Sequence, residues 1–471
     1  MATIIPFKGL RYNQAIVRDL ADVVTPPYDV IDAAGQDRYY RRHPCNIIRL
    51  EYGKTFAGDG EAGNRYTRAA ADYDAWRREN VLAPEDGHAL YLYEQEYTTG
   101  GERRVRSGFI SGVKLEPYEK GVVLPHEETM PRHKADRLEL MRACRANFSP
   151  IFSLYADPEM AVTNALRETA GSRAPDAAFT DENGERHRLW VVRDTAAIGK
   201  VQQLMEDRRI FIADGHHRYE TALNYKRERD AGGGSPAGSE AAASSSCSRG
   251  PGGAFSCSRT GEPAHHYVMM TLVNLYDPGL VILPTHRLLR NVDEAHLAAL
   301  PERLKEFFTL EEFPPAPDRA NFTEFLSGLA ARGASGSGRI SHPHAFGVYL
   351  GSGRLYLASL KEDVQLEKIM PPEKSPAWRC LDVSVLHTLV IEKYLGIGGE
   401  LMARGDHISY SREEEGALAA VDRGDYQLAF FMNPTLVEEV TAVAGNGEKM
   451  PQKSTYFYPK LITGLVINAL D

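Results

Sequence analysis

The residues best suited to chemistry lie in RIFIADGHHRYETAL, residues 209–223. The apolar run 210–213 is typical of a buried strand, and the residues after it have the spacing of an amphipathic helix. Five residues join the two: Asp214, Gly215, His216, His217 and Arg218. Gly215 can take positive φ in a sharp turn, and a helix N-terminus offers unpaired N–H groups and a partial positive charge. An acid, two imidazoles and a guanidinium at such a turn therefore predict a site for a phosphate or carboxylate.

A purely structural interpretation of this turn also exists. Asp214 can cap the helix by accepting a backbone N–H, with Arg218 pairing to it across one turn. Adjacent helical residues point about 100° apart, so we expect His216 and His217 to have different roles. We interpret Asp214 and His217 as candidate catalytic groups, and the rest of the turn as anion-binding.

The second polar cluster is LPHEETMPRHKADRL, residues 124–138. Most of its charges fit a solvated loop that leads into a helix, with Asp136 in the first turn. His126, Lys134 and Arg137 are the candidates for phosphate binding. His126 begins HEE and not HExxH, so the spacing of a metalloprotease zinc site is missing.

The third cluster is MPQKSTYFYPK, residues 450–460, in which Lys453, Ser454 and Thr455 stand together. An ammonium group neutralises phosphate, and neighbouring hydroxyls can donate hydrogen bonds to it. The segment lacks the GxxxxGK[ST] pattern of a P-loop. A turn into an edge strand, 454–458, explains the same residues, so both interpretations remain open.

The fourth cluster is VTPPYDVI, residues 24–31, whose prolines stiffen the backbone before Tyr28 and Asp29. Asp29 can act as a general base, although an Asx turn accounts for it equally. Tyr28 can stack on a base or pack in the core. No GxGxxG follows an early strand, so a Rossmann dinucleotide site has no support in the sequence.

Composition narrows the class of protein. The chain of 471 residues is 43% hydrophobic, which is ordinary for globular domains, and its net charge of −9 argues against general nucleic-acid binding. No signal peptide or apolar run long enough for a bilayer is evident, so we expect a cytoplasmic protein without a membrane anchor. The five scattered cysteines predict reduced thiols, and the oligomeric state leaves no signature.

The clearest boundary is the Gly-, Ser- and Ala-rich segment 231–263, which predicts a disordered insertion. It separates an N-terminal α+β region, 1–230, from a C-terminal α/β region, 264–471, that completes the fold. The fold class is therefore α+β with mixed sheets. Lesser loops are expected at 311–318 and 330–344. Predicted strands are 89–98, 105–115, 151–155, 188–193, 267–275 and 427–432, and predicted helices are 69–80, 138–146, 160–169, 383–394, 413–422 and 434–444.

The four clusters resemble the bacterial and archaeal family known as domain of unknown function 1015, over nearly the whole chain. The strings that carry the resemblance are TPPYDVI, HEETMPRHKADRL, ADGHHRYETAL and MPQKSTYFYP. The family has no firmly assigned activity. The segment after Asp230 is a departure peculiar to this chain.

The ADGHHR string is also similar to the signature of the ParB and sulfiredoxin-like superfamily, in which such a turn contacts nucleotide phosphates. Free serine kinases in that superfamily carry the same string and phosphorylate L-serine. The resemblance implies a ParB/sulfiredoxin-like core, with Asp214 on the acceptor and His217 and Arg218 on phosphates. Sulfiredoxin chemistry needs a cysteine in this turn, and none is present.

The sequence thus predicts a nucleotide-dependent phosphotransferase that acts on a small hydroxylated metabolite. ATP or ADP would be the cofactor, with Mg²⁺ possible at Asp214. Two alternatives remain open: a phosphatase of phosphoserine or a similar monoester, and a non-catalytic nucleotide-binding regulatory protein. In each case the expected partner is a small phosphorylated molecule and not nucleic acid.

Overall fold

The computed structural model describes two compact units. The described residues are 2–129, 131–232, 261–316, 319–333 and 344–470. Unit 1 comprises 1–125, 129–280 and 459–471, and unit 2 comprises 126–128 and 281–458. The domain scheme expected from the sequence, 1–230 and 264–471, stays a prediction. Residues 233–260 of the expected insertion lie outside the described residues.

The main sheet of unit 1 has nine strands within the described residues, in the order β6-β11-β8-β12-β5-β4-β10-β9, with β1 paired to β5. The strands are β1 (Ile4–Ile5), β4 (Leu90–Thr99), β5 (Glu102–Lys114), β6 (Val123–Leu124), β8 (Ile151–Tyr155), β9 (Ala177–Thr180), β10 (Arg186–Val192), β11 (Ile210–Asp214) and β12 (Tyr267–Asn274). Strands β8 and β12 are buried along their whole length and pair in parallel. Such uninterrupted apolar strands are typical of the centre of a covered sheet.

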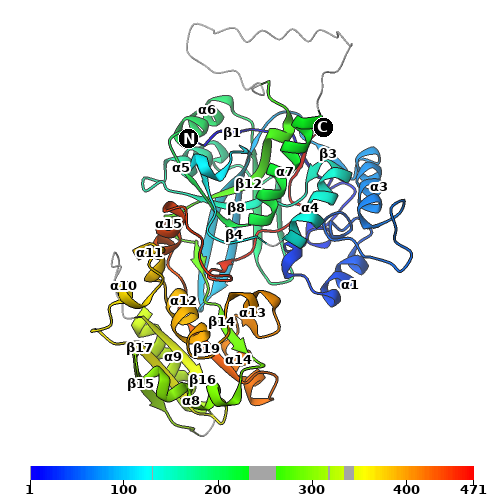
Figure 1. Cartoon of the computed structure of the whole chain (residues 1–471). Helices are drawn as coiled ribbons and strands as arrows, with labels where there is room; N and C mark the ends of the chain where they lie inside the picture. Colours follow the sequence, from blue (N-terminus) through cyan, green and yellow to red (C-terminus); the bar gives the residue numbers. More distant parts are fainter. Residues whose placement is uncertain (1, 130, 233–260, 317–318, 334–343, 471) are drawn as a thin grey trace. The chain divides into compact units, whose positions relative to one another are not determined.

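A smaller sheet and several helices complete unit 1. The sheet has the order β3-β2-β21-β7, formed by β3 (Leu82–Pro84), β2 (Gly9–Tyr12), β21 (Ile467–Ala469) and β7 (Ala146–Asn147). The helices are α1 (Ala33–Arg42), α2 (Ile48–Glu51), α3 (Arg65–Arg78), α4 (Pro131–Cys144), α5 (Ala161–Ala170), α6 (Thr195–Met205) and α7 (His216–Gly232), with short 3₁₀ helices η1 (Leu20–Asp22), η2 (Tyr28–Val30), η3 (Tyr118–Lys120) and η4 (Ala264–His266). Helices α4 and α7 lie side by side (Figure 1). Their contact brings the second polar cluster next to the Asp214 turn.

Unit 2 is built on a six-stranded antiparallel sheet, counted over the described residues, in the order β15-β17-β16-β19-β14-β18. Its strands are β15 (Phe308–Phe313), β17 (Leu355–Leu360), β16 (Ala345–Tyr349), β19 (Leu428–Met432), β14 (His286–Leu289) and β18 (Ile408–Ser411), and β13 (Val281–Ile282) pairs with β20 (Phe457–Tyr458). The helices are α8 (Glu294–Leu304), α9 (Ala320–Gly333), α10 (Leu366–Ile369), α11 (Pro376–Arg379), α12 (Asp382–Val385), the π-helix η6 (Leu386–Glu392), α13 (Gly399–Arg404), α14 (Glu414–Asp422) and α15 (Val437–Gly445). Helix α9 packs its phenylalanines against β16 and β17.

The mixed architecture with several sheets agrees with the α+β prediction, and most predicted elements are confirmed within one to three residues at each end. Two predicted helices are wrong at their starts: the helix predicted at 138–146 begins at Pro131, so Asp136 lies beyond its first turn, and the helix predicted at 69–80 begins at Arg65. The expected loop 311–318 is wrong at its start, because β15 continues to Phe313. The expected loop 330–344 is likewise wrong at its start, because α9 continues to Gly333, and 334–343 lie outside the described residues. The expected edge strand 454–458 is reduced to β20. Among the described residues, no helix combines the length and apolar character that crossing a bilayer requires.

Candidate functional site

The Asp214 turn, defined here as residues 214–218, joins β11 to α7 in unit 1. The register between β11 and β8 shifts between Ile212 and Asp214, so a bulge precedes the turn. Gly215 has φ of 99°, a conformation that side chains other than glycine rarely adopt. Helix α7 begins at His216, directly after it. The backbone therefore reverses sharply where the sequence predicted it would, and a bulge is a common way to aim a side chain at a strand end.

The Asp214 carboxylate is held by two cations. Lys460 donates a hydrogen bond from Nζ to Oδ2 over 2.7 Å, and Nη2 of Arg218 lies 3.8 Å from Oδ1. Burial alone would raise the pKa of Asp214, but the charges of Lys460 and Arg218 outweigh it and hold that pKa well below its ordinary range. Asp214 is thus a carboxylate at neutral pH. Such a group orients a hydroxyl or a cation better than it accepts a proton.

Arg218 folds back over the turn. Its Nη1 donates a hydrogen bond to the carbonyl of Pro150 over 2.6 Å, just before β8. A Cβ built on Gly215 would lie 3.0 Å from Nε and Nη2 of Arg218, so the guanidinium rests against the glycine backbone. Among the described residues, the guanidinium makes no other hydrogen bond, and Asp214 lies beyond hydrogen-bond reach. Several of its five N–H donors are therefore available to a ligand.

A pocket in unit 1 connects Arg218 with Arg137. The cavity measures about 400 Å³, including the solvent-open space at its mouth. Its polar lining consists of Glu51, Arg137, Asn147, Ser149, Arg218 and Thr221. Two guanidinium groups in one lining suit an anion with several oxygens, and the buried Glu51 in the same lining already pairs with Arg137 over 3.3 Å and accepts a hydrogen bond from Ser149 over 2.8 Å.

Arg137 is tied firmly within this pocket. It is buried, donates to Oδ2 of Asp136 through Nε over 2.8 Å and to the carbonyl of Glu51 through Nη1 over 2.8 Å. Its guanidinium lies 4.1 Å from the ring centroid of Tyr28. Burial raises the pKa of Tyr28 to about 12, with the positive charge of Arg137 opposing the rise. Arg137 is thus held by acids and an aromatic ring, which fixes its position in the wall.

Asp29 lies on η2 directly after Tyr28 and is exposed. Because the ring of Tyr28 lies against the Arg137 guanidinium, the 3₁₀ turn with Asp29 lies next to an arginine of the pocket. The structure therefore brings residues of three polar clusters together in unit 1, and Lys460, the last residue of the cluster 450–460, joins them at Asp214. It leaves the roles of the individual residues as predictions.

The histidines and Lys134 lie on the α4–α7 contact. The rings of His133 and His217 have centroids 5.1 Å apart, and His216 is buried. Lys134 Nζ donates to Glu220 over 2.8 Å, so this predicted phosphate ligand is paired with an acid. An anion at Lys134 would have to compete with Glu220.

The remaining predicted residues lie in unit 2. His126 is buried, and its Nε2 lies 2.9 Å from Oγ1 of Thr455. Lys453 has an exposed side chain and a positive φ of 56°, and Ser454 is buried with its hydroxyl donating to the carbonyl of Pro451. These contacts close a turn, as the structural interpretation of this segment expected.

Ser454 lines a second pocket in unit 2, of about 430 Å³ including open solvent, together with Thr285, Arg287 and Thr435. Arg287 is buried, and its Nη2 donates to the carbonyl of Lys453 over 3.0 Å. Its Nε has no hydrogen-bond partner in the described part of the chain, and burial lowers its pKa to about 10. The buried Arg287 guanidinium, which among the described residues is bonded only to neutral carbonyls, makes this pocket a second candidate site for an anion.

Sequence reasoning missed two important residues. The sequence predicts phosphate binding for the cluster that Lys460 ends, but it does not predict that Lys460 pairs with Asp214 across 246 positions. Its backbone carbonyl accepts a hydrogen bond from Gln95 of β4 over 3.0 Å, which explains its placement. Arg287 belongs to no motif. The spacing of residues along the chain does not indicate that either side chain lies at a site.

The structure thus combines a mixed α/β fold with a strand-to-helix turn that carries charged side chains. The chain belongs to the family described as "Protein of unknown function (DUF1015)", whose model matches residues 4–384. No curated protein matches the chain.

Several solved structures align with the chain. A conserved hypothetical protein from Pyrococcus furiosus is 13% identical, covers 72% of this chain and 89% of its own, and has a TM-score of 0.30. A free serine kinase in complex with AMP is 12% identical, with coverages of 72% and 84% and a TM-score of 0.31. SbnI with a C-terminal truncation, from Staphylococcus aureus, is 10% identical, with coverages of 75% and 85% and a TM-score of 0.32. Likeness at this level transfers neither a fold nor an activity.

Proposed function

We propose that the protein is a nucleotide-dependent phosphotransferase whose site is the Asp214 turn and the adjoining Arg137–Arg218 pocket. The acceptor is a small hydroxylated metabolite. The proposal includes a ParB/sulfiredoxin-like core around β11 and α7, because the ADGHHR string resembles the phosphate-binding turn of that superfamily. The same resemblance makes L-serine the first acceptor to test.

The observation that carries the proposal is that the Arg218 guanidinium makes few hydrogen bonds within the described part of the protein. Its guanidinium sits at the N-terminus of α7, against Gly215, with a single hydrogen bond among the described residues. Free N–H donors beside a helix N-terminus attract phosphate oxygens by charge and by hydrogen bonding. Phosphoryl transfer asks a protein mainly to position its reactants and to stabilise charge on the phosphoryl oxygens.

The other side chains near the turn have separate proposed roles. Asp214, ionised and anchored by Lys460, orients the acceptor hydroxyl or the cations around it. His217 is the candidate proton acceptor, because an imidazole can exchange protons near neutral pH. Arg137 lines the same pocket and can add positive charge, and the exposed Asp29 is a second candidate for the general base.

ATP or ADP is the phosphoryl donor in this proposal. Nucleotide phosphates usually carry Mg²⁺ into such sites, bound through one or two carboxylates. The residues present do not fit a preformed magnesium site, because both oxygens of Asp214 face Lys460 and Arg218. Neither group of three potential metal ligands in the described residues includes Asp214. In this proposal Arg137, Arg218 and Lys460 neutralise the negative charge at the site.

Product analysis tests the proposal. Purified protein is incubated with L-serine and ATP, with L-serine and ADP, and with phosphoserine alone. Phosphoserine formation with matching loss of nucleotide phosphate supports the proposal. Phosphate release from phosphoserine without nucleotide identifies a phosphatase. Nucleotide binding without turnover of any acceptor in a panel of hydroxylated metabolites identifies a regulatory protein.

Variants test which residues carry the reaction. Arg218→Met should abolish phosphoryl transfer, whereas Gly199→Ala on α6, where a Cβ meets nothing within 4 Å, should leave it unchanged.

A further inference from the structure

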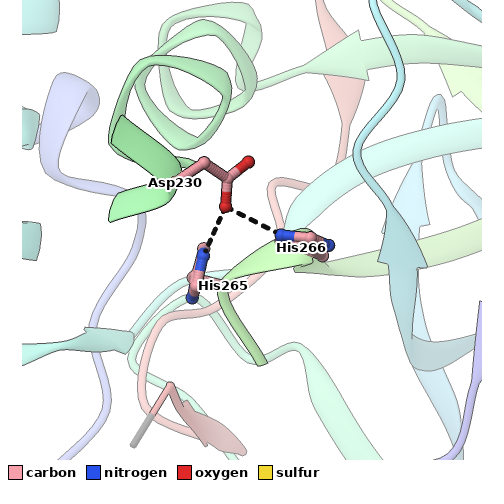
Figure 2. A group of neighbouring side chains, drawn as sticks. All are labelled: Asp230, His265 and His266. Atoms are coloured by element: carbon pink, nitrogen blue, oxygen red, sulfur yellow. Dashed lines mark hydrogen bonds and ion pairs between the residues drawn. The ribbon is translucent and has the colours of Figure 1, made fainter. Parts of the chain in front are cut away.

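A cluster of two imidazoles and a carboxylate lies in unit 1, away from the residues assigned above. Asp230 is on the last turns of α7, and His265 and His266 are on η4, just before β12. Figure 2 shows both rings directed at one carboxylate oxygen: Oδ1 of Asp230 lies 3.0 Å from Nε2 of His265 and 2.9 Å from Nε2 of His266. The two rings are nearly perpendicular, at 86°, with centroids 4.8 Å apart.

These distances resemble those around a bound metal. Bonds of about 2.0–2.2 Å to nitrogen and oxygen place neighbouring ligand atoms roughly 3.0–3.4 Å apart, depending on whether the geometry is octahedral or tetrahedral. The two oxygen–nitrogen separations, 3.0 and 2.9 Å, lie at the lower end of that range, and all three atoms lie within 4.8 Å of one another. We propose that Asp230, His265 and His266 bind a divalent transition metal of the zinc class.

Surrounding groups hold the ligands in place. Lys226, one turn before Asp230, donates to Oδ2 over 2.7 Å and leaves Oδ1 facing the imidazoles. His266 donates its backbone N–H to the carbonyl of Pro263 over 3.0 Å, which fixes η4. The hydroxyl of Tyr267 donates to Glu262 over 2.7 Å at the start of β12. Of these contacts, the one from Lys226 reaches a ligand side chain directly, and such hydrogen bonds orient the ligands of natural metal sites.

A second cluster, Asp181, Glu185 and His187, has a different character. His187 is fully buried, stacks on Phe179 with ring centroids 4.8 Å apart, and lies 2.7 Å from the hydroxyl of Tyr93 through Nδ1. Asp181 accepts backbone N–H groups of its own turn. This group closes a hairpin and offers one imidazole, so it suits a transition metal less well.

Three protein ligands leave at least one position on the metal for water or another ligand. The ligands also come from both sides of residues 231–264 in the chain, so a bound ion ties the end of α7 to the start of β12. Metal that binds only the folded chain stabilises it by mass action. Bound zinc should therefore raise the melting temperature of unit 1.

Zinc titration of the full chain, without a histidine tag, tests this site. We expect one saturable Zn²⁺ site that involves these residues, and a visible absorption band when Co²⁺ replaces zinc. His265→Ala, His266→Ala and Asp230→Asn should each weaken zinc binding at least tenfold and remove the zinc-dependent rise in melting temperature. Gly199→Ala on α6, where a Cβ meets nothing within 4 Å, is the control. It keeps all three ligands and their hydrogen-bond partners, so zinc should bind as it does to the native chain.

Two results would overturn the proposal. One is the absence of saturable zinc binding to the native chain. The other is zinc binding that the three ligand variants leave unchanged, because the ion would then sit elsewhere, as at His187. Circular dichroism of each variant without metal distinguishes lost ligation from lost folding.

Discussion

Asp214 illustrates how single residues at this site depend on partners far away in the sequence. Its carboxylate is 16% exposed and is ionised because Lys460 and Arg218 compensate for burial. Lys460, in turn, is held through its backbone by Gln95. The pair is therefore a product of the tertiary fold, and its charge state determines what Asp214 can do.

Replacing Lys460 tests the pairing. Lys460→Met should lower the free energy of unfolding of unit 1 at pH 7 by about 2 kcal/mol, because a hydrogen bond to a charged, largely buried partner is lost. Denaturant unfolding monitored at Trp76 and Trp190, which are in unit 1, measures the change.

The pH dependence of this effect has a definite sign. The folded-state pKa of Asp214 is depressed, so its stabilising effect is fully present above the unfolded-state pKa of about 3.9 and is lost as pH falls toward the folded value. The difference between native chain and variant should shrink below about pH 3.9. A difference independent of pH would show that Lys460 acts through packing alone.

Gly215 gives a second prediction at this scale. Gly215→Ala forces a side chain into φ of 99° and places Cβ 3.0 Å from the Arg218 guanidinium. We expect a loss of about 1–3 kcal/mol in stability, together with weaker anion binding as Arg218 is displaced. Gly199→Ala is the control, since it lies in α6 with open space around it and should stabilise by about 0.5–1 kcal/mol. Equal effects of the two substitutions would contradict the close approach of Arg218.

At the scale of elements, the sequence predicted strands and helices well where apolar periodicity was strong. Strand β8 begins and ends where predicted, and β4 pairs with β5 across Gly100 and Gly101, which both have positive φ. Predictions failed where polar composition suggested a loop, as at Glu311, because an edge strand such as β15 tolerates exposed acids. The predicted helix 383–394 divides into α12 and the π-helix η6, a change of hydrogen bonding that periodicity does not record.

The central strand β5 gives a prediction for the sheet. Gly108 faces β12 so closely that a Cβ would lie 2.8 Å from the carbonyl oxygen of Leu272 and 2.7 Å from Cγ2 of Val273. Gly108→Ala should therefore push β5 from β12 and cost about 1–3 kcal/mol in thermal and denaturant unfolding. Gly87→Ala, where a Cβ meets nothing within 4 Å, should change stability by less than about 0.5 kcal/mol. A neutral Gly108→Ala would show that this strand contact is looser than described.

For the whole molecule, the motifs indicated which segments matter but not how they assemble. The resemblance selected the Asp214 turn, and the structure adds that Arg137 and Arg218 line one pocket. The partners Lys460 and Glu51 could not be found, because no local pattern relates residues that meet only after folding. The same limit hid the Asp230, His265 and His266 cluster, whose ligands flank a low-complexity segment.

Calorimetric titration with ADP tests the central claim most directly, because it requires no knowledge of the acceptor. The native chain should bind ADP with an affinity that falls at least tenfold in Arg218→Met, by loss of charge-assisted hydrogen bonds worth about 1.5–3 kcal/mol. Gly199→Ala should bind as the native chain does. An ADP affinity that is the same in Arg218→Met, or no ADP binding by the native chain, would contradict the account.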